Sequence, residues 1–356
     1  MEHNRIQKPP VVRRADLTDR EFTILEAVIS SFIATARPVG SRTLSKLPGM
    51  DLSPASIRNT MSDLEEKGYL AQPFQSAGRV PTDKAYRLHV DNILLYCRNA
   101  PPSAVRALEG IVEDPAVQRM LHRAADALSV LTHELGVGLE PVVDEGVLEG
   151  MELIRLSSER VMMVLNIGSS LVKTIFVELD SRADGITLDH LAARLRERLV
   201  GLTFREIRRT ARRRLRDAVE DENDPMNVFV QSADNLFEFE GGDRQLVLGE
   251  SGRLADQPEF RDEGRLRTLI DLTDRKKLLL EMMKRRAGNE GISISIGSEN
   301  DVSELAGFTI VTDTYKMGGM RGIIGVIGPT RMSYSRIISV VEYSSRLLSQ
   351  VLDRPR

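Results

Sequence analysis

The sequence is poor in cysteine and in aromatic side chains. It holds one cysteine, Cys97, and so cannot form an internal disulfide, as is usual in a reducing compartment. It has no tryptophan and only 4% aromatic residues, so its cores must be built from Leu, Ile, Val and Met. No apolar run approaches the roughly 20 residues that span a bilayer. The basic N-terminus also lacks the apolar stretch of a signal peptide. These absences predict a cytoplasmic protein without a membrane segment.

The net charge is also small, at −3, but the two signs are distributed unevenly. Residues 1–98 carry a net charge of +3, and the rest of the chain carries −6. Because phosphate affinity depends on the local positive potential, a mildly basic N-terminal module is compatible with nucleic-acid binding. The length of 356 residues exceeds one ordinary core and predicts two or three domains.

The first helical pattern begins at a capping box, in which Thr18 and Glu21 satisfy each other's backbone amides. Apolar residues then recur at helical spacing until residues 38–40, which include a proline and a glycine, break the pattern. Ser41 is expected to cap a short second segment. A proline-glycine turn at residues 48–49 ends that segment.

The third segment, residues 53–67, has the clearest helix signals. Ser53 and Pro54 are typical of an N-cap and a first helical residue, where a missing amide hydrogen costs nothing. The apolar face consists of Ile57, Met61 and Leu64. The opposite, small and polar face consists of Ala55, Ser56, Arg58, Asn59 and Ser62. Helix, short helix, tight turn and helix is the order of a helix-turn-helix.

This polar face has the chemistry needed to read DNA. An Asn side chain can pair bidentately with adenine, an Arg with guanine or phosphate, and a small Ala leaves room for a thymine methyl. A small polar helix face can equally be a solvated surface. The composition of the face alone therefore does not decide between DNA contact and solvent exposure.

The segment after this helix predicts a second DNA-binding element. Tyr69–Ala71 can form a strand, Ser76–Gly78 a turn, and Arg79 with Val80 the return strand. Such a two-stranded wing would carry Arg79 at its tip or edge, beside the DNA backbone. The N-terminal residues therefore predict a winged helix.

These residues resemble the N-terminal part of the HrcA family, the heat-inducible transcription repressors of bacteria. The resemblance rests on long strings and not on a bare helix-turn-helix pattern. They are Val39-Gly40-Ser41, Ser53–Asn59, Met61–Glu65, Ser76–Lys84 and Tyr86-Arg87. Gln75, Ala85 and His89 depart from the residues more usual in the family, and these departures can alter wing contacts.

The rest of the chain predicts a sheet domain that an insertion interrupts. A Pro101-Pro102 linker leads into helical segments, after which the chain becomes apolar and β-branched. Strand patterns lie at residues 151–156, 161–167, 172–179, 292–296, 308–312 and 323–327. A final helix is expected from about Tyr334, and residues 181–260 form the block that looks foreign to the sheet.

The resemblance gives this order an interpretation. Residues 296–300 and 325–332 are similar to the C-terminal pattern of the HrcA family, so the match extends over nearly the whole chain. The family has a winged helix, a GAF-like domain and a dimerising domain inserted into the latter. The implied fold class is α+β multidomain, with three parts. They are a winged helix-turn-helix at 1–98, a GAF-like α/β sheet domain at 103–180 and 261–356, and an inserted helical or mixed dimerisation domain at 181–260.

A second basic segment lies within the predicted insertion. Between Arg194 and Arg216 there are ten arginines, interleaved with leucine and isoleucine. This stretch is a candidate second nucleic-acid site. The alternative is an amphipathic helix pair whose basic face pairs with acidic neighbours such as Asp221 and Glu222.

No catalytic or metal-binding pattern accompanies these segments. The five histidines are scattered, and the glycines of residues 318–328 lack the dinucleotide and P-loop fingerprints, so close strand packing explains them better. Cys97 lies on the apolar side of a helical pattern, which favours core packing. Glu299 and Asp301 make one acidic turn and not an acid/base pair. We therefore expect no enzyme activity, no cofactor and no metal, while a GAF-like domain leaves a small-molecule ligand open.

The resemblance implies a negative regulator of heat-shock chaperone operons. It would bind double-stranded DNA at an inverted-repeat operator as a homodimer, with its activity modulated by the GroE chaperonin. The candidate DNA contacts are Ser41, Arg42, Ser53, Ala55, Ser56, Arg58, Asn59, Ser62, Arg79, Lys84 and Arg87. Of these, Arg79, Lys84 and Arg87 would mainly meet phosphates.

Three other functions stay open at this point. The first is a metabolite-sensing regulator whose GAF-like domain sets DNA affinity. The second is an enzyme with an appended DNA-binding domain, which the absent catalytic pattern disfavours. The third is an RNA-binding or nonspecific nucleoid protein that uses the arginine-rich stretch, and its binding would ignore sequence and collapse with salt.

Overall fold

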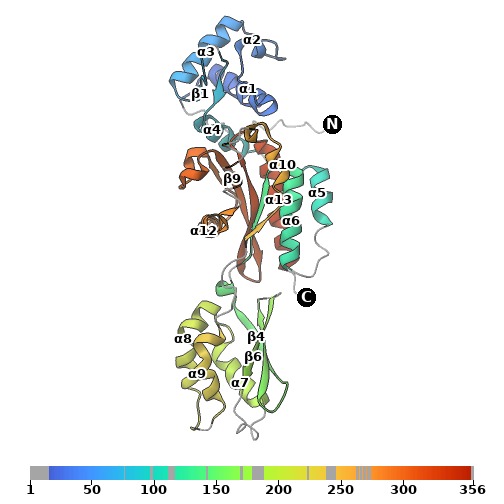
Figure 1. Cartoon of the computed structure of the whole chain (residues 1–356), viewed down its shortest axis with the longest axis vertical. Helices are drawn as coiled ribbons and strands as arrows, with labels where there is room; N and C mark the ends of the chain where they lie inside the picture. The colour runs from blue at the N-terminus through green and yellow to red at the C-terminus, as the bar shows by residue number, and fades with distance from the viewer. Residues whose placement is uncertain are drawn as a thin grey trace, which may run out of the picture.

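The protein is described here by a computed structural model, and it consists of three bodies arranged along one long axis (Figure 1). The structure describes residues 16–75, 77–96, 99–110, 117–141, 143–168, 171–178, 188–222, 224–237, 246–261 and 274–353, together with 264, 267 and 270. Cys97 and Ser76, which the sequence analysis singled out, lie outside these residues. We call the three bodies the reader, the central domain and the insert.

The reader has the element order predicted for residues 16–93. Its elements are α1 (Asp19–Thr35), α2 (Ser41–Leu44), α3 (Pro54–Glu66), β1 (Leu70–Ala71), β2 (Val80–Pro81) and α4 (Asp83–Ile93). The capping box of Thr18 and Glu21 is confirmed at the start of α1. The cap predicted for α2 is wrong, because α2 begins at Ser41 itself and Gly40 occupies the N-cap position without a side-chain bond.

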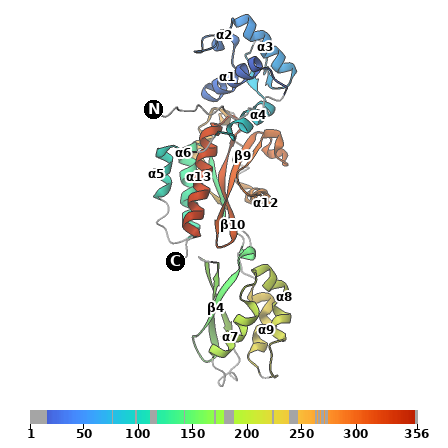
Figure 2. The same cartoon turned by 180° about the vertical axis from the view of Figure 1, so that it is seen from behind.

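The central domain is built on a five-stranded antiparallel sheet with the order β7-β3-β10-β9-β8. Its strands are β3 (Leu135–Leu139), β7 (Leu246–Leu248), β8 (Ser293–Ile296), β9 (Phe308–Met317) and β10 (Met320–Pro329). Its helices are α5 (Pro102–Glu109), α6 (Val117–Thr132), α10 (Gly252–Ala255), α12 (Lys276–Arg286) and α13 (Tyr334–Leu352). The sheet lies between α6 and α13 on one side and α12 on the other (Figure 2).

Strand β10 is central and buried on both faces, which explains its continuous apolar sequence. Ile323 and Ile327 belong to the core cluster that includes residues of α10 and α12. Ile324 and Val326 belong to the other cluster, with residues of α6 and α13. Gly325 leaves no space for a side chain, since a β-carbon there would lie 2.2 Å from the carbonyl oxygen of Val311 on β9. This contact supports strand packing as the role of that glycine.

A glycine also allows α6 to lie close against the sheet. A β-carbon added to Gly136 of β3 would come 1.9 Å from the carbonyl oxygen of Ala125 on α6. We expect Gly136→Ala to lower the free energy of unfolding by about 1–3 kcal/mol, because backbone must move to relieve the overlap. Urea unfolding measures this, with Gly110→Ala as control, since a β-carbon at Gly110 meets no atom within 4 Å. Equal losses in both variants would contradict the close approach.

The insert is a separate body at the end of the molecule opposite the reader (Figure 1). Its strands β4 (Leu148–Arg155), β5 (Arg160–Ile167) and β6 (Leu171–Glu178) form their own antiparallel sheet in the order β4-β5-β6. Its helices are α7 (Leu188–Leu199), α8 (Phe204–Arg216) and α9 (Met226–Leu236). They cover one face of this three-stranded sheet (Figure 1).

The domain boundaries predicted from sequence therefore need correction. The strands of residues 148–178 were assigned to the central sheet, but among the described strands they pair with one another and belong to the insert. Strand β7 was assigned to the insertion, but it pairs with β3 in the central sheet. The insertion thus lies between β3 and β7, about residues 140–245 and not 181–260. Apolar alternation identifies a strand, but it does not identify its pairing partner.

Candidate nucleic-acid interface

The N-terminus of α3 is built as predicted. The Ser53 hydroxyl accepts a hydrogen bond from the backbone N–H of Ser56 (3.2 Å), and Pro54 is the first helical residue. Ile57, Met61 and Leu64 are buried against the rest of the reader. The opposite face leaves Ala55, Arg58 and Asn59 exposed. A rigid, capped helix thus presents three of the predicted base contacts to solvent at the outer end of the molecule (Figure 1).

Two predicted contacts of α3 are less accessible than the sequence pattern suggested. Ser56 and Ser62 are half-buried. The Arg20 guanidinium of α1 donates hydrogen bonds to the Ser56 hydroxyl and to the Ser56 carbonyl oxygen. Sequence reasoning missed Arg20, because 36 residues separate it from Ser56 and no local pattern links them. Arg20 therefore adds a positive charge beside the N-terminal turn of α3.

The C-terminal end of α3 is held by two lysines. Lys67 Nζ lies 2.8 Å from a Glu21 carboxylate oxygen and donates to the carbonyl oxygen of Asp16 (2.9 Å). The hydrogen bond from Lys67, with those from Thr18, holds the pKa of Glu21 below its usual value. Lys84 Nζ donates to the carbonyl oxygen of Lys67 (2.8 Å), so the predicted phosphate contact Lys84 also caps α3.

The wing differs from the expectation in where Arg79 points. The backbone of Arg79 pairs with that of Val39, through N–H···O bonds of 2.8 and 2.9 Å, so the wing is joined to the segment before α2. Its guanidinium makes an ion pair with Glu65 of α3 (2.8 Å), and its buried Nε atom has no hydrogen-bond partner in the described part of the chain. The wing instead exposes Phe74, which is 66% accessible and which sequence reasoning missed.

Arg87 lies at the junction of the reader and the central domain, and its predicted phosphate contact stays a prediction. It makes an ion pair with Glu299 of the central domain and donates to the carbonyl oxygen of Ile294 (2.8 Å) and to Asp91 (3.4 Å). Burial opposes ionisation of Glu299, but hydrogen bonds from Arg87 and from the Ile296 N–H hold its pKa below the usual value. Arg87 therefore fastens the reader to the central domain.

This position of Arg87 has a measurable consequence. Arg87→Ala is expected to leave the salt dependence of DNA affinity unchanged, because the guanidinium is occupied within the protein. Arg42→Ala, at an exposed position of α2, should reduce the slope of log K against log salt by about one unit. Titrations at several salt concentrations measure both slopes. A reduced slope in the Arg87 variant would support Arg87 as a phosphate contact.

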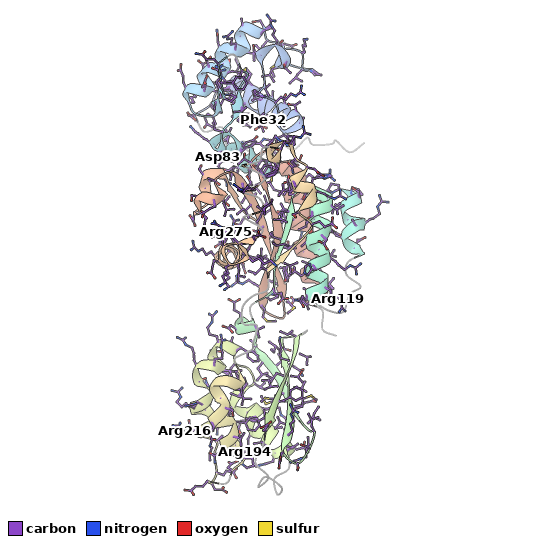
Figure 3. The ribbon with its side chains drawn as sticks, viewed as in Figure 1. Phe32, Asp83, Arg119, Arg194, Arg216 and Arg275 are labelled. Carbon is purple, nitrogen blue, oxygen red and sulfur yellow. The ribbon has the colours of Figure 1, made fainter. Side chains whose placement is uncertain are left out.

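The arginine-rich stretch lies in the insert, at the far end from the reader (Figure 3). It forms the amphipathic pair α7 and α8, and some of its arginines have partners within the insert. Arg194 makes an ion pair with Asp224, and Arg208 makes one with Asp144. These contacts agree with the structural interpretation of the stretch, in which its basic face pairs with acidic neighbours.

Among the residues that the structure describes, no group of three His, Cys, Asp or Glu side chains could hold a metal ion. Among the helices of the described ranges, none combines the length and the apolarity that crossing a membrane requires. The exposed face of α3, with α2 and the wing beside it, is thus the strongest candidate site.

Comparison with known proteins extends over nearly the whole chain. The family description "HrcA protein C terminal domain" matches residues 118–338. The heat-inducible transcription repressor HrcA of Chlorobium phaeobacteroides (strain BS1) is 36% identical, covering 95% of this chain and 99% of the relative. That of Geobacter sulfurreducens is 34% identical over 95% of this chain and 99% of its own length. A crystal structure titled as a hypothetical protein aligns with a TM-score of 0.60 at 22% identity, over 95% and 99% of the two chains, which shows a shared fold.

Proposed function

The chain belongs to the HrcA family of heat-inducible transcription repressors and negatively regulates heat-shock genes, and we propose that it does so as a homodimer on an inverted-repeat operator. The operator lies upstream of chaperone operons. The observation that carries this proposal is the exposed polar face of α3, presented at one end of an elongated molecule. The protein acts in the cytoplasm, with the DNA that it regulates.

In this proposal α3 enters the major groove. Asn59 and Arg58 read base edges through hydrogen bonds, and Ala55 leaves space for a thymine methyl. The other reader contacts position the helix on the backbone, and they are Ser41, Arg42, Ser53, Ser56, Ser62, Arg79 and Lys84. Glu65 occupies part of the Arg79 side chain, and the carbonyl oxygen of Lys67 occupies one donor of Lys84. Only the remaining donors of these two side chains contact phosphate.

The insert provides the surface that joins two copies. The face of its sheet opposite α7–α9 carries Ile154, Met162 and Phe176 in one row, since Ile154 pairs with Met162 and Met162 pairs with Phe176 across the three strands. Phe176 is 55% exposed and Val172, on the same face of β6, is 60% exposed. An apolar sheet face of this kind is typical of an interface, because a three-stranded sheet needs a cover on its apolar side.

The position of this face suits a twofold operator. The exposed sheet face looks sideways from the long axis, and the reader lies at the opposite end of that axis (Figure 2). A twofold axis parallel to the long axis would therefore place both readers at the same end. Two α3 helices could then enter successive major grooves of a pseudo-palindromic site.

Regulation by the GroE chaperonin is part of the same proposal. Membership of the HrcA family supports it. In this mechanism the chaperonin keeps the repressor competent to bind, and unfolded proteins that occupy the chaperonin relieve repression.

The test is a titration of the full-length protein against two duplexes at one near-physiological salt concentration. One duplex carries the inverted repeat from upstream of a chaperonin operon, and the other has the same composition in scrambled order. We expect the operator to bind at least about a thousandfold more tightly. Equal binding of both duplexes by a dimeric preparation would overturn the operator assignment and would favour a nonspecific nucleoid protein.

A further inference from the structure

A cavity of about 750 Å³ lies between the reader and the central domain. The reader contributes Phe32 of α1 and Asp83 and Tyr86 of α4, while the central domain contributes Phe260 and Phe308. Figure 3 labels Phe32 in the reader, Asp83 at its junction with the central domain, and Arg275 within the central domain. The volume lies within the range of small-molecule sites, and aromatic walls with a few polar groups are typical of them.

One polar group of this cavity has no partner. Tyr86 is 1% exposed, and its buried hydroxyl has no hydrogen-bond partner among the residues that the structure describes. Its ring packs at 5.7 Å from the ring of Tyr334, whose own hydroxyl bonds the carbonyl oxygen of Thr330 (2.7 Å). A buried hydroxyl without a partner is costly and rare in native structures. Burial raises the pKa of Tyr86 far above its usual value, so the hydroxyl stays protonated.

The charges around the cavity are already balanced. Arg331 makes an ion pair with Glu259, and Arg275 makes one with Glu304 at 3.1 Å. The Asp83 carboxylate accepts hydrogen bonds from the backbone N–H (2.8 Å) and the hydroxyl (2.9 Å) of Ser298. A charged ligand would have to break one of these pairs. The lining therefore favours an uncharged molecule.

We infer that this cavity binds an uncharged, largely aromatic small molecule with one carbonyl-type oxygen, which accepts a hydrogen bond from the Tyr86 hydroxyl, and that its occupancy sets the operator affinity of the reader. The regulatory part of this inference rests on the proposed operator binding. The binding part does not, because it concerns the protein without DNA.

The coupling follows from where the cavity lies. The reader is attached to the central domain by the bonds of Asp83 to Ser298 and of Arg87 to Glu299, and by a bond from Arg331 to the carbonyl oxygen of Ile33 (2.7 Å). Asp83 and Arg331 also line the cavity. A ligand that contacts both bodies binds differently when their relative orientation changes. Occupancy of the cavity therefore favours the orientation of α3 that binds the ligand more tightly, and the size of the effect is set by the difference in affinity between the two orientations.

The first experiment measures binding to the full-length protein without DNA, by fluorine NMR. The probe is para-fluoroacetophenone, which carries an aromatic ring and a carbonyl. The matched control compound is para-fluoroethylbenzene, which lacks the carbonyl oxygen. We expect Tyr86→Phe to weaken binding of the ketone about fivefold and to leave binding of the fluoroethylbenzene unchanged. The melting temperature of the Tyr86→Phe protein should not fall below that of wild type, because the removed hydroxyl had no partner among the described residues.

Two further variants locate the site. Tyr334→Phe is the matched control, since its hydroxyl bonds within the central domain, and it should bind the ketone like wild type. Gly307→Leu should abolish binding of both probes, because Gly307 lines the cavity and a β-carbon there meets no atom within 4 Å. Absence of ketone binding to wild type, or equal ketone binding by wild type and Tyr86→Phe, would overturn the proposed site.

The second experiment repeats the operator titration with saturating ketone. We expect a shift of about fivefold or more in wild type and none in Gly307→Leu. Ketone binding without this shift would overturn the regulatory role while leaving the site in place. If wild type failed to bind the operator at all, the proposed function would fail, whereas the NMR result would still decide the binding site.

Discussion

Replacing Phe176 with aspartate is expected to make the protein monomeric and to weaken operator binding by about a hundredfold or more. The substitution places a charge at the β6 end of the exposed apolar row of the insert, on a face that a partner copy would bury. Two readers joined in one dimer bind the second half-site as an intramolecular event, and a monomer loses that gain. Analytical ultracentrifugation and the operator titration measure the two effects.

The controls separate dimerisation from folding. Phe176 is more than half exposed and lies under the Arg160 guanidinium at 5.0 Å, so its replacement does not open the core of the insert. Phe176→Leu keeps an apolar side chain and should remain dimeric. Phe176→Asp should keep the circular dichroism of wild type. A Phe176→Asp protein that sediments as a dimer and binds the operator normally would eliminate this face as the interface.

Asn59→Ala is expected to remove most of the preference for operator over scrambled DNA, with a loss of about 1–3 kcal/mol on the operator alone. Asn59 is exposed on α3, and its amide can donate and accept at one adenine edge. Scrambled DNA should bind with nearly unchanged affinity, because phosphate contacts carry the nonspecific term.

Asn289→Ala is the matched control for this substitution. Asn289 is also exposed, but it follows α12 in the central domain, distant from the reader. It should change neither titration. If Asn59→Ala weakened both duplexes equally, Asn59 would be a backbone contact, and the reading of bases would have to come from another residue such as Arg58.

Helix α3 could be predicted from sequence because its determinants are local. Ser53 caps the helix and Pro54 starts it within one turn, and Ile57, Met61 and Leu64 mark the buried face by their spacing alone. The exposed Ala55, Arg58 and Asn59 then follow from helix geometry. The same reasoning failed at Ser41, where a serine before an apolar pattern is the first residue of the helix and not its cap.

The basic residues around the helix could not be sorted in this way. The sequence does not distinguish three basic residues that have different partners. Arg79 pairs with Glu65, Lys84 donates to the carbonyl oxygen of Lys67, and Arg87 pairs with Glu299. The partner of Arg87 is 212 residues away. Whether an arginine is free for phosphate depends on the acid that the fold brings to it, and that acid has no fixed place in the sequence.

The family, the capped helix α3 and the positions of most strands follow from the sequence, since these depend on residues within one or two turns or on strings specific to the family. The pairing of the strands follows only from the folded chain, which places residues 148–178 in the insert and β7 in the central domain. The folded chain also places Tyr86 in the lining of the cavity between the reader and the central domain. Strand pairing and cavities arise from contacts between distant residues, and alternation along one strand has the same period whichever partner it meets.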